Sequence, residues 1–458
     1  MKVVMENSRR KFIKASTAGA VTVLAGGILP GFNAKSYDRI IGANEKVNIA
    51  VAGFHNRGTG HIRTFSSLEN VNVAAICDID QRLFPKGIEE VESRGGKKPA
   101  TYTDFRRILD DKNIDAVSIV TPDHWHALHT IWACQAGKDV YIEKPLSYTI
   151  EEGRKMVEAS RKYGRVVQTG TQSRSNIVVH RAMQLIREGV IGDIYMGRAI
   201  VFGFRPDIGK VADSPIPEGV DWDMFLGPAP YRPFNENRFQ YKWHWFWDTS
   251  TTEFGNNATH WVDLIRMAMG IKVHPQKIQC MGDFYVWDSD QEIPNIQLGA
   301  YKYNDGRTIQ IDVRSIYNNP ESGEKSGAFL YGSKGWMHLK HQGYKVFLGQ
   351  DDEEGPSFSV DQYDPTKDKT AIQEFKGLDV THMQNFIDCV RSGEWKNLNA
   401  DINEGHMSTS IGLLGNIAYR VGRTLEFDGE TEKFLNDEEA NSHLTRKYRE
   451  PYVLPGKV

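Results

Sequence analysis

The protein has 458 residues, of which 56 are Lys or Arg and 59 are Asp or Glu, and its formal net charge is −3. This length suffices for about three domains of roughly 150 residues each, and 25% charged with 40% apolar residues excludes wholesale disorder. The near balance of acidic and basic residues argues against a protein that binds nucleic acid. The four cysteines stand far apart without a C-x-x-C pair, so they predict neither a disulfide framework nor a zinc site.

A basic segment followed by a weakly apolar run opens the chain. Residues 8–14 read Ser-Arg-Arg-Lys-Phe-Ile-Lys, which resembles the S-R-R-x-F-L-K pattern of twin-arginine export signals. Glycines dilute the apolar run at residues 15–30 below what a stable membrane span needs. We therefore predict that residues 1–34 are a twin-arginine signal peptide and that the protein is exported to the periplasm.

Apolar strands alternate with helical patterns between residues 45 and 168. Strands are predicted at residues 46–52, 71–77, 116–120, 139–142 and 166–168. Helices are predicted between them at residues 59–68, 88–94, 125–136 and 150–163. This alternation favours an α/β fold with a parallel, doubly wound sheet, and we assign residues 45–168 to a Rossmann dinucleotide-binding domain.

The pattern changes after residue 168. Alternating apolar and polar residues predict strands at 194–201, 277–286, 296–303, 308–315, 328–331 and 336–339. Helices are predicted at 178–188, 258–269, 381–392 and 404–422, and a long polar loop at 350–376. We therefore expect a C-terminal α+β domain at 169–430 with a large, mostly antiparallel open sheet, followed by a tail at 431–458.

The first strand runs into a glycine turn that suits a dinucleotide. The turn reads Gly53-Phe54-His55-Asn56-Arg57-Gly58, which matches G-x-G-x-x-G except that His55 replaces the second glycine. Glycines allow a tight turn and a close approach of the backbone to a pyrophosphate at a helix N-terminus. Asp78 ends the second strand, where a carboxylate binds the ribose hydroxyls and disfavours a 2′-phosphate. The cofactor is therefore expected to be NAD rather than NADP.

Two further strands end in polar residues that point to the same crevice. Thr121-Pro122 and then His126 follow one strand, and Glu143-Lys144-Pro145 follow the next. A lysine in that position can bind a substrate hydroxyl and favour a developing alkoxide. His124, His126 and His129 come without a fourth ligand, so we predict no metal site.

These motifs together resemble the Gfo/Idh/MocA oxidoreductases, which include glucose–fructose oxidoreductase and inositol dehydrogenase. The resemblance rests on the glycine turn, Asp78 and above all Glu143-Lys144-Pro145, and it extends to about residue 425. It implies a sugar or polyol substrate and an open sheet that mediates homo-oligomers. It also implies a set of cofactor contacts at Gly53, His55, Asn56, Arg57, Gly58, Asp78, Thr121, Pro122, His126, Glu143, Lys144 and Gln172.

In this family, the lysine of E-K-P and a histidine from a D-x-x-x-H element act on the substrate carbinol. Carried over, these are Lys144 and His260 as catalytic residues, and imidazole suits proton transfer near neutral pH. The sequence departs from the pattern at Asn256, which stands where the family has Asp. Asn256 can orient the His260 ring or bind a substrate hydroxyl. Glu253 or Asp263 is then the nearby carboxylate that could supply negative charge.

Aromatic residues alternate just before this element. Trp243, Trp245 and Trp247 favour either a carbohydrate subsite or an aromatic core strand. His244 is a further candidate for binding a hydroxyl. The predicted substrate contacts are Lys144, Arg174, Trp245, Asp248, Asn256 and His260.

The sequence thus predicts an exported, NAD-dependent oxidoreductase that oxidises a ring hydroxyl of a sugar or glycoside, with C3 as one position. Because a periplasm holds no pool of free nicotinamide, we expect the cofactor to be loaded before export, to stay tightly bound, and to be regenerated by an unidentified hydride acceptor. Two alternatives stay open. One is a redox-neutral NAD-dependent glycosidase of the same family, and the other is a sugar-binding or regulatory protein without catalysis.

Overall fold

The computed structural model describes residues 46–360 and 377–458. The predicted signal peptide and most of the predicted loop at 350–376 lie outside these residues. In the described part of the chain, we find no helix with the length and apolar character needed to cross a membrane.

Sheet A is a six-stranded parallel sheet with the spatial order β3-β2-β1-β4-β5-β6. It has the doubly wound arrangement that the alternating pattern predicts, and the order reverses between β1 and β4. The strands are β1 (Val47–Ala52), β2 (Val71–Cys77), β3 (Ala100–Tyr102), β4 (Ala116–Ile119), β5 (Asp139–Glu143) and β6 (Val167–Gly170).

Helices cover both faces of sheet A because successive strand residues point to opposite sides. Ile49 and Val51 pack in the cluster that holds α3 (Arg57–Ser67) and α4 (Phe84–Glu92). Ala50 and Ala52 pack in the cluster of α5 (Phe105–Asp110), α6 (His126–Gln135) and α7 (Ile150–Lys162). The structure adds β3 and α5 to the elements expected from the sequence.

The C-terminal part of the chain completes both of these cores. Helix α12 (Leu378–Ser392) places Met383 and Phe386 in the α3 cluster. Tyr452 and Leu454, in the segment predicted as a tail, are buried in the α6 cluster. The Rossmann domain is therefore built from residues well beyond 168.

Sheet B has ten strands in the order β14-β13-β12-β11-β7-β10-β9-β8-β15-β16. Only β7 and β10 pair in parallel among its described strands, so the sheet is mostly antiparallel, as predicted. The strands are β7 (Ile194–Val201), β8 (Lys277–Asp283), β9 (Ile296–Lys302), β10 (Thr308–Arg314), β11 (Ser326–Gly332), β12 (Gly335–Leu339), β13 (Gly343–Leu348), β14 (Glu353–Ser359), β15 (Leu425–Asp428) and β16 (Lys433–Phe434).

The loop prediction is wrong for residues 353–359. These residues form the edge strand β14, which pairs with β13. Its side chains are mostly exposed, so the segment lacks the alternation that marks a half-buried strand in the sequence.

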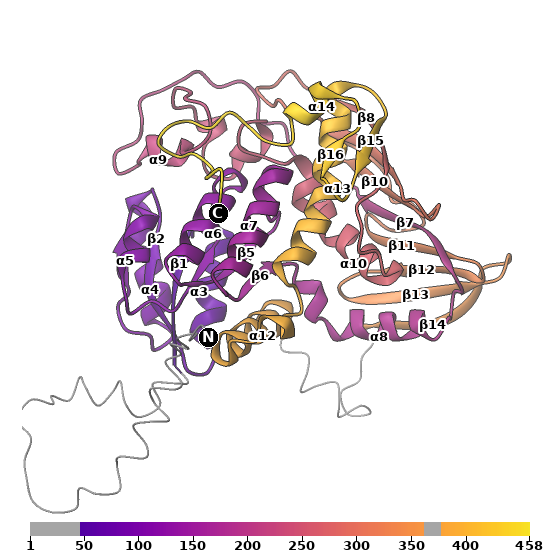
Figure 1. The fold of residues 1–458 in the computed structure, drawn as a ribbon, viewed down its shortest axis with the longest axis horizontal. Coiled ribbons are helices and arrows are strands. Elements are labelled where there is room, and N and C mark those ends of the chain that lie inside the picture. Colours follow the sequence, from indigo (N-terminus) through magenta and orange to yellow (C-terminus); the bar gives the residue numbers. More distant parts are fainter. Residues whose placement is uncertain (1–45, 361–376) are drawn as a thin grey trace, which may run out of the picture. The chain divides into compact units, whose positions relative to one another are not determined.

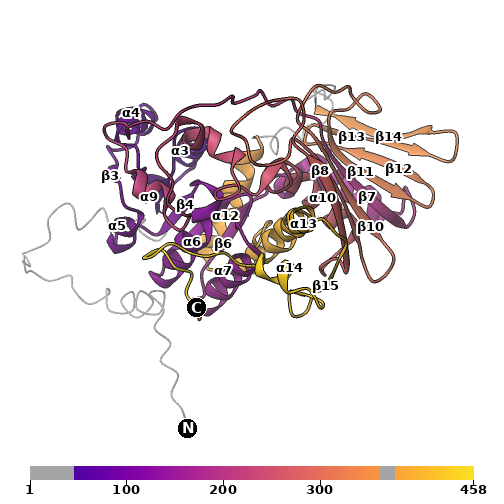
Figure 2. The ribbon, with the colours of Figure 1, turned by 90° about the horizontal axis from the view of Figure 1, so that it is seen from above.

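Three helices cover one face of sheet B: α8 (Ile177–Arg187), α10 (Thr259–Met269) and α13 (Ile402–Val421). Helices α10 and α13 lie between the two sheets (Figures 1 and 2). On sheet B, Tyr195, Met281 and Leu298 are exposed. The two remaining short helices are α9 (Trp222–Leu226) and α14 (Glu438–Ser442).

The three histidines near the start of α6 have separate packing roles. His124 donates from Nε2 to the Phe225 carbonyl (2.9 Å), and both ring nitrogens of His126 contact backbone carbonyls, of Pro145 and Thr121 (2.7 Å each). The ring of His129 stacks on Phe105 and Trp125. This packing fixes the end of β4 against α9.

We predict that His124 makes the protein sensitive to mild acid. Burial lowers the pKa of His124 from 6.5 to about 3, so below pH 6.5 the unfolded chain binds a proton that the native state excludes. Lowering the pH from 8 to 5 therefore reduces the free energy of unfolding by about 2 kcal/mol. Urea unfolding of wild type and His124→Gln measures the effect, because glutamine keeps the bond to Phe225 but does not titrate. An equal loss of stability in the two proteins would contradict the assignment.

Candidate active site

A cavity of about 490 Å³ lies at the carboxyl ends of β1, β2, β4 and β5. Gly53, Asp78, Thr121 and Lys144, which follow these four strands, all line it. Ligands of open α/β sheets collect at this edge, where the strand order reverses. Of the twelve predicted cofactor contacts, eleven line the cavity: Gly53, His55, Asn56, Arg57, Gly58, Asp78, Thr121, Pro122, His126, Glu143 and Lys144.

The turn after β1 requires its two glycines. Gly53 has a φ of +80°, and a Cβ there would lie 2.7 Å from the Val120 carbonyl oxygen. A Cβ on Gly58 would lie 1.8 Å from the carbonyl oxygen of Gly53. His55 is exposed in the same turn, so its side chain does not obstruct the turn. The N-cap residue Asn56 makes no side-chain bond to α3, which leaves the first N–H groups of the helix free for a pyrophosphate.

Asp78 is fixed at the end of β2 by the backbone. Its Oδ2 accepts the Phe54 N–H (2.9 Å) and its Oδ1 accepts the Asp80 N–H (3.1 Å). Burial raises the pKa of Asp78 to about 6. Each oxygen keeps a lone pair for a ribose hydroxyl, so the residues present fit a bound NAD.

Glu143 is the centre of a buried network beneath the cavity. Its Oε1 accepts hydrogen bonds from Arg57 Nε (3.0 Å), His61 Nε2 (2.9 Å) and Gln172 Nε2 (2.9 Å). Burial opposes ionisation, but Arg57 and His61 outweigh it and hold the pKa of Glu143 well below its usual range. The Gln172 amide also donates to the Tyr141 hydroxyl (3.3 Å), and Gln172 does not line the cavity.

Lys144 lies at the cavity wall and is held by Asn256. Its Nζ donates to the Asn256 side-chain oxygen (2.7 Å) and to its carbonyl (3.0 Å). Burial lowers the pKa of Lys144, against the attraction of the Glu143, Asp123 and Glu253 carboxylates. Asn256 belongs to a π-helical turn, Phe254–Ala258, which directly precedes α10. The residue that replaces the family's Asp therefore orients the lysine.

His260 lies near Lys144 but is absent from the cavity lining. Its Nδ1 is buried without a hydrogen-bond partner among the described residues, and its ring meets His341 edge-on at 5.9 Å. Burial holds the pKa of His260 well below its usual range, and Lys144 lowers it further. The neighbouring carboxylates are engaged elsewhere: Glu253 binds Arg205 (3.1 Å) and Asp263 binds Arg174 (2.7 Å).

Three predicted substrate contacts lie outside the cavity. Arg174 is buried and forms ion pairs with Asp263 and Glu404, so it holds the domain core together. Trp245 is buried against Phe246 and Ile293. Asp248 pairs with Arg232 at 2.5 Å. The structure therefore does not bring Arg174, Trp245 and Asp248 to this cavity.

An aromatic wall is present, and it includes the candidates Trp243 and His244. Residues 240–245 form a 3₁₀ helix, so neighbours on one face are three apart rather than two. Trp243 and His244 line the cavity with their rings stacked at 3.6 Å, and Tyr241 lies beside them. Arg205 and Asn257 also line it. No sequence motif marks these two residues, because they reach the site through the long segment between β7 and α10.

The comparison with known proteins decides the family. Residues 47–171 match the profile described as the oxidoreductase family, NAD-binding Rossmann fold. Residues 202–454 match the profile of the oxidoreductase family, C-terminal alpha/beta domain. The chain belongs to the Gfo/Idh/MocA family. Its first domain is therefore an NAD-binding Rossmann domain, as the glycine turn and Asp78 predict.

The curated relatives of this Gfo/Idh/MocA protein are named as glycosidases. A protein of Shewanella oneidensis named alpha-N-acetylgalactosaminidase is 30% identical over 209 residues, which are 42% of this chain and 45% of the relative. Others, from further Shewanella strains, are named glycosyl hydrolase family 109 proteins. The chain thus matches less than half the length of these relatives.

Solved structures share the fold at low identity. The WlbA dehydrogenase of Bordetella pertussis, in complex with NADH and UDP-GlcNAcA, aligns with a TM-score of 0.59 and 19% identity over 84% of this chain and 99% of its own. An aldose-aldose oxidoreductase of Caulobacter crescentus, complexed with glycerol, gives a TM-score of 0.60 and 20% identity over 83% and 100%. The fold predicted from the sequence is confirmed.

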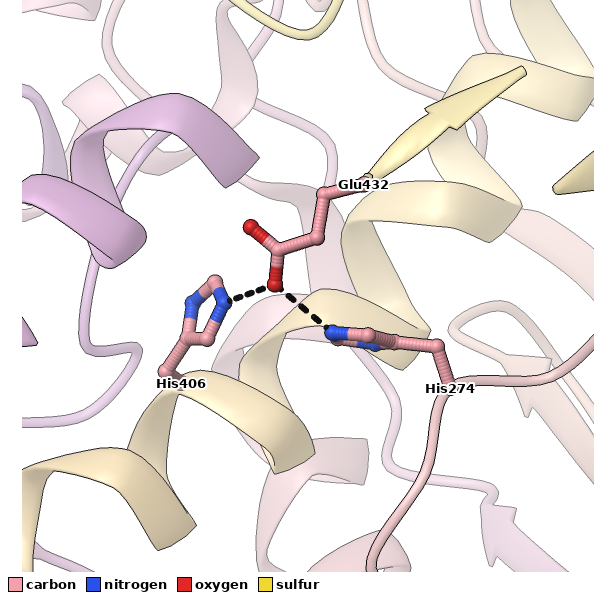
Figure 3. Close-up of side chains that lie close together, drawn as sticks. All are labelled: His274, His406 and Glu432. Atoms are coloured by element: carbon pink, nitrogen blue, oxygen red, sulfur yellow. Dashed lines mark hydrogen bonds and ion pairs between the residues drawn. The ribbon is translucent and has the colours of Figure 1, made fainter. Parts of the chain in front are cut away.

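A separate cluster of His274, His406 and Glu432 has the donor atoms of a metal site (Figure 3). Both imidazoles contact Glu432 Oε1 through Nε2, at 2.8 and 2.7 Å. Arg154 also binds this carboxylate with two nitrogens, at 2.6 and 3.1 Å. Because the guanidinium already neutralises Glu432, the cluster is better described as a clamp between the C-terminal segment, α7 and α13 than as a cation site.

We expect Asp78→Ala to weaken NAD binding by at least about tenfold, because the ribose hydroxyls lose their acceptor. The loss of NADP affinity should be smaller, since the same change removes a charge that repels a 2′-phosphate. Titration of both cofactors by fluorescence or calorimetry measures the two constants. Equal affinity for NAD in Asp78→Ala and wild type would show that Asp78 does not contact the ribose.

Proposed function

We propose that this protein is an exported NAD-dependent oxidoreductase that oxidises a ring hydroxyl of a sugar or glycoside, with C3 and a 3-keto product as the preferred case. The observation that carries the proposal is the placement of Lys144. Its ammonium group lies in the same cavity as the NAD-binding turn and is held by Asn256. Solved relatives in complex with NADH and either UDP-GlcNAcA or L-sorbose support this substrate class.

Bound NAD supplies the hydride acceptor, so the alcohol carbon loses a hydride and becomes a carbonyl. Lys144 donates a hydrogen bond to the hydroxyl oxygen and stabilises its developing negative charge. Its burial strengthens this effect, since a charge interaction is less screened away from water. Trp243 provides an apolar face against the C–H groups of a ring, and Asn257 provides an amide for its hydroxyls.

The hydroxyl proton needs an acceptor, and two histidines lie near Lys144. His260 is the residue that the family pattern indicates. His244 lines the cavity itself, and its Nδ1 donates to the Tyr241 carbonyl (2.6 Å), which leaves Nε2 as the basic nitrogen. Burial lowers the pKa of His244 to about 3, so the ring is neutral at physiological pH. The imidazole that accepts the proton is the one whose replacement by Asn causes the larger loss of kcat.

A second candidate function is a redox-neutral glycosidase, which the names of the curated relatives favour. Such an enzyme oxidises the sugar transiently, eliminates the glycosidic substituent, adds water and returns the hydride from the same cofactor. The first step is the one described above and needs the same Lys144. The two functions therefore differ only in the fate of the ketone.

We further propose that NAD is loaded before export through the twin-arginine pathway and stays bound in the periplasm. Either function fits this, since a second sugar, or the keto-sugar that remains after elimination and addition of water, accepts the hydride back from the cofactor. The exposed Tyr195, Met281 and Leu298 of sheet B are proposed to form the contact of a homo-oligomer.

Replacing the lysine tests the proposed role. Lys144→Met should lower kcat by about 100- to 1,000-fold because the developing alkoxide loses its positive partner. NAD affinity should change little, since the turn and Asp78 are intact. The matched control is Lys112→Met, an exposed lysine. A Lys144→Met variant that keeps wild-type turnover would contradict the mechanism.

Product analysis separates the two enzyme functions. Protein isolated from the exported fraction is incubated with a panel of α- and β-glycosides, and the sugars and bound cofactor are measured by mass spectrometry. We expect bound nicotinamide and a keto-glycoside with an intact aglycone. Free aglycone with unoxidised sugar would instead assign the glycosidase, and protein that carries no nicotinamide and gains none from micromolar NAD would overturn the proposal of a retained cofactor.

A further inference from the structure

A second cavity, of about 320 Å³, shares no lining residue with the active cavity. It is formed by the segment before α7, the loop at residues 247–251, the C-terminal part of α13 and the residues that follow α14. Three cationic side chains line it: Arg420, Arg446 and Lys447. We call it the basic cavity. Its volume is in the range of small-molecule sites.

Arg446 is the most constrained of these cations. Its Nε and Nη1 are buried without a hydrogen-bond partner among the described residues. Its Nη2 donates to the Asp248 carbonyl (3.1 Å), and its guanidinium carbon lies 4.3 Å from the centre of the Tyr148 ring. Buried donors without acceptors are costly, so Arg446 is prepared to bind an acceptor.

Arg420 and Lys447 add two further positive charges. The guanidinium of Arg420 lies over the Trp247 ring at 5.2 Å. Neither side chain forms an ion pair with any residue in the described part of the chain. The two arginines are therefore oriented by aromatic rings rather than by carboxylates.

The nearby acidic groups do not neutralise this charge. Asp248 lines the basic cavity but pairs with Arg232. Glu152 feels the charge of Arg446, yet its carboxylate accepts the backbone N–H groups of Tyr148 and Thr149 and the hydroxyl of Tyr448. Burial raises the pKa of Glu152 to about 7. The basic cavity thus keeps an excess of positive charge.

We propose that the basic cavity binds a small anion that carries a phosphate or carboxylate group. The planar guanidinium groups of Arg420 and Arg446 can each donate two parallel hydrogen bonds to the oxygens of a phosphate or carboxylate. Lys447 adds a further positive charge. Ser250 and Thr251 line the cavity, and the Ser250 hydroxyl supplies a hydrogen-bond donor. Thr251 also bonds Asp123, which lines the active cavity, so the anion would sit one contact away from the catalytic site.

Calorimetry on the NAD-saturated full-length protein tests this proposal, because saturation fills the pyrophosphate site of the active cavity. The probes are inorganic phosphate, glucuronate and, as an uncharged reference, methyl glucoside. We expect saturable binding of phosphate or glucuronate to the wild type. The double variant R420Q/R446Q should bind at least about tenfold more weakly. R107Q, which removes an exposed arginine elsewhere, is the matched control and should bind as the wild type does.

The outcomes are distinct. Binding of phosphate alone, of glucuronate alone or of both supports the proposal and identifies the anionic group. Binding of neither probe overturns it, as does binding that is equally strong in R420Q/R446Q. If the Arg446 substitution prevents folding, R420Q/K447Q carries the same test, because both of these side chains are exposed. Turnover of the proposed sugar substrate is measured separately with Lys144→Met. A failure of the anion to bind the basic cavity therefore does not bear on the proposed oxidoreductase function.

Discussion

Glu143 is ionised and buried at the carboxyl end of β5, and the site depends on the groups that stabilise its charge. A buried carboxylate is tolerated only where hydrogen bonds and opposite charges surround it. Arg57 and His61 come from α3, and Gln172 follows β6, so three donors from two separate segments converge on one oxygen. Because Lys144 is the next residue, the same network fixes where this lysine leaves the strand.

The network also joins parts of the chain that are distant in sequence. Arg57 binds Asp379 of α12 through both terminal nitrogens, at 2.7 Å each. From the other side of the active cavity, Asn256 holds the ammonium of Lys144. The lysine is thus positioned from the Rossmann domain at its backbone and from the C-terminal domain at its tip. Both domains therefore determine where the ammonium group of Lys144 lies.

Local patterns were enough to predict the glycine turn, Asp78, Lys144 and every strand of sheet A except the short β3. Each of these depends on hydrophobic periodicity or on a backbone constraint that a few adjacent residues express, such as the carbonyl that lies too close for any side chain at Gly53. The edge strand β14 escaped prediction because neither of its faces is well buried.

The predicted site residues that do not line the active cavity are held by interactions that join distant residues. In the sequence, Arg174 resembles a ligand-binding residue. In the structure, its guanidinium instead donates to the carboxylate of Asp263, 89 positions later. Trp245 was assigned from an alternating pattern, whereas the segment winds as a 3₁₀ helix and turns Trp243 to the cavity instead. Arg205 carries no local signal at all, since its role is defined by the Glu253 carboxylate.

The most direct test of the account follows hydrogen from the sugar to the cofactor. Glycosides deuterated at each ring carbon in turn are mixed with the NAD-loaded protein for a single turnover, and the nicotinamide is analysed by mass spectrometry. The account predicts that one position transfers its deuterium to the cofactor and that Lys144→Met transfers none in the same time. Sugars that bind the NAD-loaded protein but never label the nicotinamide would contradict it.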